Sequence, residues 1–265
     1  MRAAALKQTP EPGRHRKVRT ASGESDRLTP GRLIDKGYRL KRRLGASDRV
    51  WLAVDPAERL VVMKTGSRSL IEHEYRILTG LVHPHIASVT DWVQCDAGSF
   101  IVSGYLSGGD LVSLAGLMPR YWLKAAHTIG LVLAWLHSRG IVHRDLKARH
   151  VMFDDSNHPW LIDFGSAAQI GSPWSIGGTT TVAPSRGNEP VMIGDDLYSY
   201  AALLHELLTG APPAAGRRCR PSDDKAGLAR LVDERLNAPA DTRQPDLAAF
   251  GAVIKSMLGE DRIQA

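Results

Sequence analysis

Short runs of alternating apolar and polar side chains dominate the first part of the sequence. Alternation over about four to eight residues is typical of β-strands that bury one face. Residues 55–59, which contain an Asp-Pro pair, have the character of a hairpin turn between two of these runs. Strands are therefore expected at residues 37–44, 50–55, 60–64, 85–93 and 99–106.

Longer segments with apolar residues every three or four positions follow these runs and predict helices. The first begins with Ser69 and Glu72, whose S-x-x-E spacing is that of a capping box. Residues 122–140 carry one apolar stripe, and residues 195–210 are apolar nearly all round, which predicts a buried helix that stops at Gly210. The last two helices are expected at residues 226–236 and 245–258.

This order of elements predicts an α+β fold of two lobes, a small β-rich lobe with one helix and a larger helical lobe. A cleft between the lobes is where polar groups on otherwise buried faces are expected to meet. We divide the chain into a basic disordered tail, the two lobes of one domain (32–260) and a short C-terminal tail, at residues 1–31, 32–106, 107–260 and 261–265.

Charge and composition narrow the class of protein. The net charge of the 265-residue chain is +6, and residues 1–30 hold seven Lys or Arg against three Asp or Glu, so the remainder is nearly neutral. Such a balance does not favour a nucleic-acid-binding domain. No apolar run is long enough to span a membrane or to form a signal peptide. The two cysteines form no CxxC motif, so we expect a cytoplasmic protein without disulfides.

Glu74 lies inside the apolar stripe of the first expected helix, between Leu70 and Leu78. An unpaired buried carboxylate is costly, so this side chain is expected to have a cationic partner. The candidate is Lys64, which strand alternation places on the same face as Val62. From these residues alone the pair could be structural or functional.

Two further carboxylates stand at the ends of elements. Asp145 follows the long helix in the sequence IVHRDLK, and Asp163 follows the apolar run WLI. These positions allow both side chains to protrude into a cleft, as an acid that activates a hydroxyl and an acid that binds a metal must do.

With Lys64, Glu74, HRDLK at 143–147, DFG at 163–165 and DLYS at 196–199, the sequence resembles the protein kinase family over residues 38–258, and most of all its bacterial serine/threonine members. The resemblance implies that Asp145 is the catalytic base and that Lys147 steadies the transferring phosphoryl group. It implies ATP as substrate and a divalent ion on Asp163.

The same resemblance assigns supporting roles. Asp196 would support the catalytic loop, and Arg144 would pair with a phosphate on the activation segment. The implied ATP-binding residues are Leu44, Gly45, Val50, Val62, Lys64, Glu74 and Asp110.

The sequence departs from the family pattern at the glycine-rich loop and at the second metal position. Gly45 stands alone and only four residues separate it from Val50, which predicts weaker or altered nucleotide binding. His150 replaces the expected asparagine. Imidazole is a poor ligand for Mg²⁺ and a better one for Mn²⁺, so either ion is expected, with a shift toward Mn²⁺. Alternatively, His150 only hydrogen-bonds to nearby backbone or to Asp145.

The activation segment and its end differ as well. Thr179, Thr180 and Thr181 are candidate autophosphorylation sites, although an unmodified loop is the alternative. Ser185 replaces the family's glutamate, which leaves Arg243 in need of another partner, for which Glu189 is the candidate.

The predicted function is transfer of the ATP γ-phosphoryl group to Ser or Thr hydroxyls of a protein substrate, including the chain itself. One alternative is a pseudokinase that serves as a binding or scaffold module, which the thin glycine loop, His150 and Ser185 favour. Another is a kinase for lipopolysaccharide sugars or other small molecules. The sequence assigns no oligomeric state.

Overall fold

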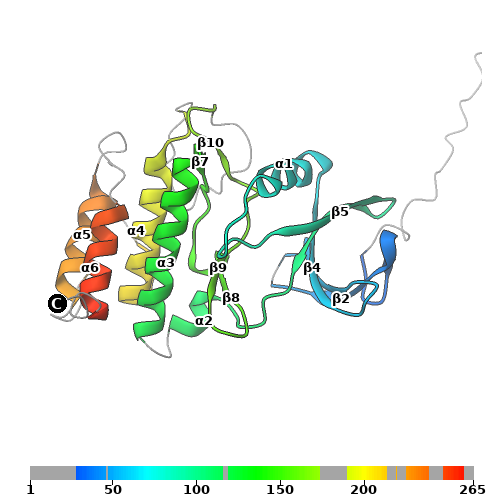
Figure 1. Cartoon of the computed structure of the whole chain (residues 1–265), viewed down its shortest axis with the longest axis horizontal. Helices are drawn as coiled ribbons and strands as arrows, with labels where there is room; N and C mark the ends of the chain where they lie inside the picture. Colours follow the sequence, from blue (N-terminus) through cyan, green and yellow to red (C-terminus); the bar gives the residue numbers. More distant parts are fainter. Residues whose placement is uncertain are drawn as a thin grey trace, which may run out of the picture.

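The computed structural model describes residues 28–45, 47–115, 119–173, 190–213, 219, 225–238 and 247–259. Within these residues the small lobe contains a six-stranded antiparallel sheet with the strand order β1-β2-β3-β4-β6-β5 (Figure 1). The strands are β1 (Leu33–Ile34), β2 (Tyr38–Arg43), β3 (Val50–Val54), β4 (Leu60–Gly66), β5 (Val89–Cys95) and β6 (Gly98–Gly104), and a 3₁₀ turn (Asp35–Gly37) joins β1 to β2.

The sheet forms because alternate side chains of its strands meet on one face. Trp51, Met63 and Phe100 are fully buried there in a single apolar cluster. Lys64 therefore points to the opposite face, and the register pairs it with Val50 on the neighbouring strand. The predicted strands at 50–55, 60–64 and 99–106 are confirmed to within a few residues.

Helix α1 (Arg68–Thr79) packs against β4, β5 and β6. Its N-cap is Ser67, whose Oγ accepts a hydrogen bond from the backbone N–H of Leu70 at 3.4 Å. The predicted capping box was therefore wrong: Ser69 already lies within the helix, and Glu72 forms a surface ion pair with Arg76. Ser67 and Ser69 both fit the local pattern of an N-cap. Ser67 is the N-cap because the helix begins directly after the end of β4.

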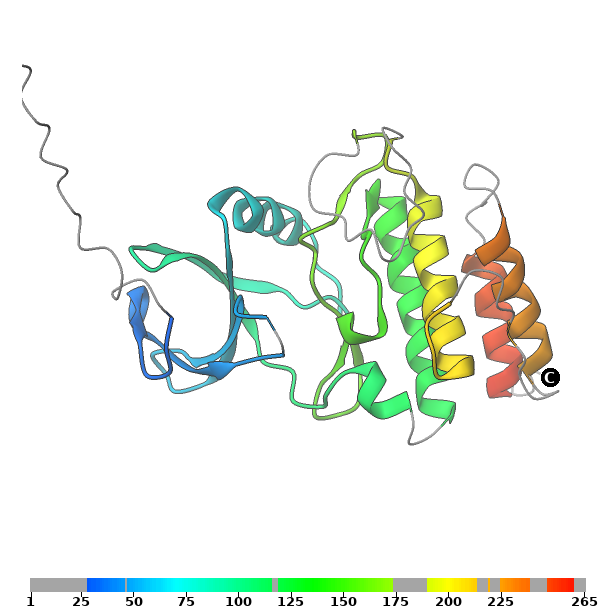
Figure 2. The same ribbon diagram turned by 180° about the vertical axis from the view of Figure 1, so that it is seen from behind.

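The larger lobe is helical, as predicted (Figure 2). Helices α3 and α4 pack together at its centre, and α5 and α6 cover them on the side away from the small lobe. The helices are α2 (Leu111–Ala115), α3 (Pro119–Ser138), α4 (Ile193–Thr209), α5 (Ala226–Asn237) and α6 (Leu247–Leu258). No helix among the described residues is long and apolar enough to cross a membrane.

Short strands line the side of this lobe that faces the small lobe. Strand β7 (Ile141–Val142) pairs with β10 (Ala168–Gln169), and β8 (Val151–Phe153) pairs with β9 (Pro159–Leu161). A 3₁₀ turn, Ala148–His150, leads into β8. These short elements hold the loops that carry the predicted site residues.

The two lobes are joined by backbone hydrogen bonds at the segment that follows α1. The backbone N–H of Leu161 donates to the carbonyl of His85 at 2.8 Å, and that of Ala87 donates to the carbonyl of Leu161 at 3.1 Å. The predicted strand at 85–93 thus begins later, at Val89, because its first residues bond to β9 instead of the small-lobe sheet.

Gly108, in the connection from β6 to α2, lies directly against β8. A Cβ atom added there would come within 2.4 Å of the carbonyl oxygen of Asp154. We therefore expect Gly108→Ala to lower the free energy of unfolding by about 1–3 kcal/mol, because backbone atoms must move apart. Gly104→Ala, where an added Cβ meets nothing within 4 Å, is the control and should change stability little. Urea unfolding followed by circular dichroism measures both, and an unchanged Gly108→Ala would contradict the close packing.

Candidate active site

An ion-pair network connects the two lobes at Lys64. Its Nζ lies 2.6 Å from Oε2 of Glu74 and 2.7 Å from Oδ1 of Asp163. The Lys64–Glu74 pair predicted from the apolar stripe of α1 is therefore present. Glu74 is 3% exposed, so its charge is compensated within the protein rather than by water.

Lys64 and Asp163 stabilise each other's charges, whereas burial, with a contribution from the Asp163 carboxylate, holds the pKa of Glu74 above its ordinary value despite Lys64. Burial alone would lower the pKa of Lys64, but the carboxylates of Glu74 and Asp163 outweigh it and hold that pKa above its ordinary value. Burial likewise acts to raise the pKa of Asp163, and the Lys64 ammonium reverses this and holds the pKa well below the usual range. Lys64 is therefore cationic and Asp163 anionic at neutral pH.

The backbone around Asp163 is held in an unusual conformation. Asp163 has φ +66°, which is uncommon for a non-glycine residue. The next residue, Phe164, donates its backbone N–H to Oε1 of Glu74 at 3.2 Å, and its buried ring meets the His143 ring edge-on at 4.8 Å. A Cβ on Gly165 would lie 3.2 Å from Oε2 of Glu74, so this position has little room for a side chain.

Asp145 lies on the loop after β7 and is 5% exposed. Its Oδ2 is 3.1 Å from Nζ of Lys147. Its backbone N–H donates to Nδ1 of His143 at 3.3 Å, so the His143 Nε2–H is left to donate to the carbonyl of Ile162 at 3.2 Å. The carboxylate of Asp145 and the ammonium of Lys147 thus lie side by side on this loop.

Asp196, at the start of α4, holds this loop through its backbone. Its two carboxylate oxygens accept hydrogen bonds from the backbone N–H groups of His143 at 2.8 Å and Arg144 at 2.7 Å, and from Nε2 of His137 at 2.9 Å. Burial acts to raise the pKa of Asp196, but the bond from His137 and the neighbouring donors hold it below the ordinary value. Arg144 is buried and has φ +66°, so the loop is held in a strained conformation.

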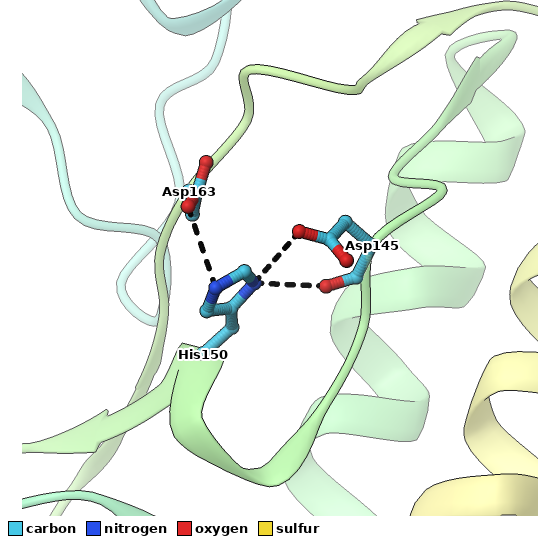
Figure 3. A group of neighbouring side chains, drawn as sticks. All are labelled: Asp145, His150 and Asp163. Atoms are coloured by element: carbon cyan, nitrogen blue, oxygen red, sulfur yellow. Dashed lines mark hydrogen bonds and ion pairs between the residues drawn. The ribbon is translucent and has the colours of Figure 1, made fainter. Parts of the chain in front are cut away.

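His150 lies between the two acids of the site (Figure 3). Its Nδ1 is 2.8 Å from the carbonyl oxygen of Asp145, and its Nε2 is 3.3 Å from Oδ2 of Asp163. Burial lowers the pKa of His150 to about 4, against the opposing effect of Asp163 and Asp145, so the ring is neutral at pH 7. One ligand atom from each of the three residues lies within 4.8 Å of the others, a spacing that could hold a metal ion.

Of the residues predicted to cover a nucleotide, Leu44 and Gly45 follow β2, Val50 begins β3 and Val62 lies in β4. Leu44 donates its backbone N–H to the carbonyl of Val50 at 2.8 Å, which closes the hairpin, and Gly45 has φ +68°. Val50 pairs with Lys64, and Val62 lies two residues before Lys64 on the same strand. Val50 and Val62 therefore share the face of the sheet that carries Lys64.

Asp110 has local partners. Its Oδ1 accepts the backbone N–H of Ser113 at 2.9 Å at the start of α2, and its Oδ2 lies 3.9 Å from the Arg149 guanidinium.

Several predicted residues lie outside the described part of the chain, namely Thr179, Thr180, Thr181, Ser185, Glu189 and Arg243.

The sequence did not single out His137, and it gave no role to His143, although His143 is part of the HRDLK motif. His137 stands in the last turn of α3, where one polar side chain ends an apolar stripe. That signal indicates an inward-facing polar group, but its partner Asp196 is 59 residues away and cannot be identified from local pattern.

Comparison with known proteins agrees with this geometry. The protein kinase domain family matches residues 45–262, so the chain belongs to the protein kinase family. It is 27% identical over 242 residues to the serine/threonine-protein kinase PknE of Mycobacterium tuberculosis, and 32% identical over 250 residues to the DNA damage-responsive serine/threonine-protein kinase RqkA of Deinococcus radiodurans.

These alignments cover most of this chain and less than half of each relative. The match to PknE covers 82% of the chain and 41% of PknE, and the match to RqkA covers 84% and 36%. A third relative, the serine/threonine-protein kinase PknH of Mycobacterium tuberculosis, is 31% identical over 65% of the chain and 28% of its own length.

We expect Asp196→Asn to lower the free energy of unfolding by about 2–4 kcal/mol at pH 7, because an amide cannot accept all three hydrogen bonds. The pKa of Asp196 is low in the folded chain, so its stabilisation is present above the ordinary carboxyl pKa and is lost on acidification. The difference from wild type should therefore shrink at low pH. Urea unfolding at several pH values tests this, with exposed Asp155→Asn as the control. Equal stability of Asp196→Asn and wild type at pH 7 would contradict it.

Proposed function

We propose that this chain transfers the γ-phosphoryl group of ATP to a serine or threonine hydroxyl of a protein. The observation that carries the proposal is the position of Lys64, whose Nζ contacts both Glu74 and Asp163 across the lobes. Membership of the protein kinase family and the names of its bacterial relatives support the same reaction.

In the proposed reaction the acceptor hydroxyl oxygen attacks the γ-phosphorus while the bond to the leaving ADP oxygen breaks. The carboxylate of Asp145 accepts or orients the hydroxyl proton. Lys147, 3.1 Å from Asp145, lies where its ammonium could neutralise charge on the transferring group. The rigid hold of Asp196 on this loop keeps both side chains in place.

Lys64 would hold the α- and β-phosphates, with Glu74 fixing the position of its ammonium. The donor set of Asp163 and His150, one carboxylate oxygen and one imidazole nitrogen, fits a divalent ion, either Mg²⁺ or Mn²⁺. When bound, such an ion neutralises charge on the nucleotide phosphates.

Leu44, Gly45, Val50 and Val62 would form the roof over the nucleotide. Only Gly45 provides the close backbone approach that glycine allows, so nucleotide affinity should be modest. Asp110 would meet the ribose through its carboxylate, whose Oδ1 already accepts the N–H of Ser113 and whose Oδ2 lies 3.9 Å from Arg149.

The assembled ion-pair network argues for an enzyme over a pseudokinase. A binding module does not need a partly buried lysine held between two carboxylates, whereas phosphoryl transfer needs that ammonium fixed in position. No contact among the described residues favours a sugar acceptor. We keep the proposed single domain of residues 32–260, to which Leu28 adds a contact with the small-lobe core.

Asp145→Asn should lower phosphate transfer to dephosphorylated casein about 100-fold or more, because the amide cannot take the hydroxyl proton. Asp155→Asn, a nearby exposed aspartate, is the matched control and should keep wild-type activity. Transfer of radiolabelled phosphate with Mg²⁺ or Mn²⁺, followed by phosphoamino-acid analysis, measures both. Undiminished transfer by Asp145→Asn would refute its role, and no transfer by wild type with either ion would favour the pseudokinase.

Glu74→Gln should reduce the same activity about 100-fold, because Lys64 loses the carboxylate that positions it. Glu72→Gln changes the same side chain on the surface of the same helix, where its partner is Arg76, and should change activity little. If both variants lose activity equally, the Lys64–Glu74 pair does not serve the reaction.

We also propose autophosphorylation within Thr179, Thr180 and Thr181. Arg144 is the candidate partner for such a phosphate, but burial and the nearby carboxylates of Asp195 and Asp196 mean that a phosphate would have to compete for it. Intact mass after incubation with ATP should rise by whole phosphate units in wild type and stay constant in Asp145→Asn. A constant wild-type mass would exclude the modification.

A further inference from the structure

His150 is held in one tautomer by the backbone. A carbonyl oxygen can only accept a hydrogen bond, so the 2.8 Å contact between Nδ1 of His150 and the carbonyl of Asp145 places the proton on Nδ1. The ring is nine-tenths buried, with a side-chain exposure of 10%, and cannot turn to another partner without losing this bond. With Nδ1 used for this bond, Nε2 is the ring atom that can offer a lone pair to a ligand.

That lone pair faces a second acceptor. Nε2 lies 3.3 Å from Oδ2 of Asp163, so a cation placed between the two atoms could be bound by both. The other carboxylate oxygen, Oδ1, is bound by Lys64 at 2.7 Å and leaves Oδ2 directed toward His150. Two electron-pair donors thus converge on one point.

The spacing suits a metal ion. With metal–ligand bonds of about 2.2 Å, adjacent corners of an octahedron lie roughly 3.1 Å apart. The observed 3.3 Å between Nε2 and Oδ2 is close to that value. The carbonyl of Asp145 meanwhile acts as the outer partner that orients a metal-binding histidine through its other ring nitrogen.

We propose that Nε2 of His150 and Oδ2 of Asp163 together ligate one divalent ion, and that this nitrogen–oxygen pair makes the chain select Mn²⁺ over Mg²⁺. The inference rests on the proposed function only for the use of that ion in phosphoryl transfer. Mg²⁺ prefers oxygen ligands and dehydrates reluctantly, whereas imidazole suits transition metals. The Nε2 ligand of His150 is therefore what favours Mn²⁺ over Mg²⁺ at this site.

The decisive measurement detects the metal–nitrogen bond directly. The full chain, labelled with ¹⁵N in its histidines, is loaded with Mn²⁺ in the presence of a non-hydrolysable ATP analogue of natural isotope abundance. Electron spin echo modulation then reports ¹⁵N coupling only from histidine. Three proteins are compared: wild type, His150→Asn, and His158→Gln as the control, since His158 is exposed and its ring hydrogen-bonds to Asp154.

We expect ¹⁵N coupling in wild type and in His158→Gln and none in His150→Asn. Competition between Mn²⁺ and Mg²⁺, followed by the free Mn²⁺ signal, should show the preference for Mn²⁺ falling at least about tenfold in His150→Asn. Absence of ¹⁵N coupling in wild type, or its persistence in His150→Asn, would overturn the proposal.

These readouts do not depend on turnover, which separates the two proposals. If wild type shows the coupling but transfers no phosphate, the metal site stands and the proposed enzyme fails. If phosphate is transferred equally well with both ions and no coupling is seen, the enzyme stands and the nitrogen ligand fails.

Discussion

A lysine ammonium that is removed from water must be neutralised nearby, and at Lys64 this requirement brings together three distant segments. Strand β4 supplies the cation, α1 supplies Glu74, and the loop after β9 supplies Asp163. Each of these elements is positioned by apolar packing of its own, but only their joint arrangement places two carboxylates within 3 Å of one ammonium. The relation of the small lobe to the large one is therefore set partly by electrostatics.

The periodic parts of the molecule could be predicted from the sequence. The helices at the core of the large lobe repeat an apolar stripe over many residues, and Glu74 stands out because it interrupts such a stripe. A charge on a buried face requires a partner, so the pair with Lys64 could be inferred before any coordinates were known. The roles of Asp145 and Asp163 came from resemblance to a family rather than from this kind of argument.

Features that depend on long-range contacts could not be predicted. The helix start at Ser67 was missed because Ser69 fits the same local pattern. Residues 85–87 hydrogen-bond to β9 rather than to the small-lobe sheet. The alternation of apolar and polar residues at 85–93 is equally consistent with pairing in that sheet, so it could not distinguish the two. For His150 the sequence left a choice between a hydrogen bond and a metal ligand. In the structure Nδ1 makes the hydrogen bond to the Asp145 backbone, and Nε2 is turned toward Oδ2 of Asp163.

The backbone bonds between residues 85–87 and Leu161 also restrict how the lobes can move. They lie just after α1, so the C-terminal end of that helix is tethered to the large lobe while its N-terminal end is attached to β4. A rotation of α1 about its tethered end would change the distance between the Glu74 carboxylate and Lys64 and would leave the backbone bonds at residues 85–87 in place.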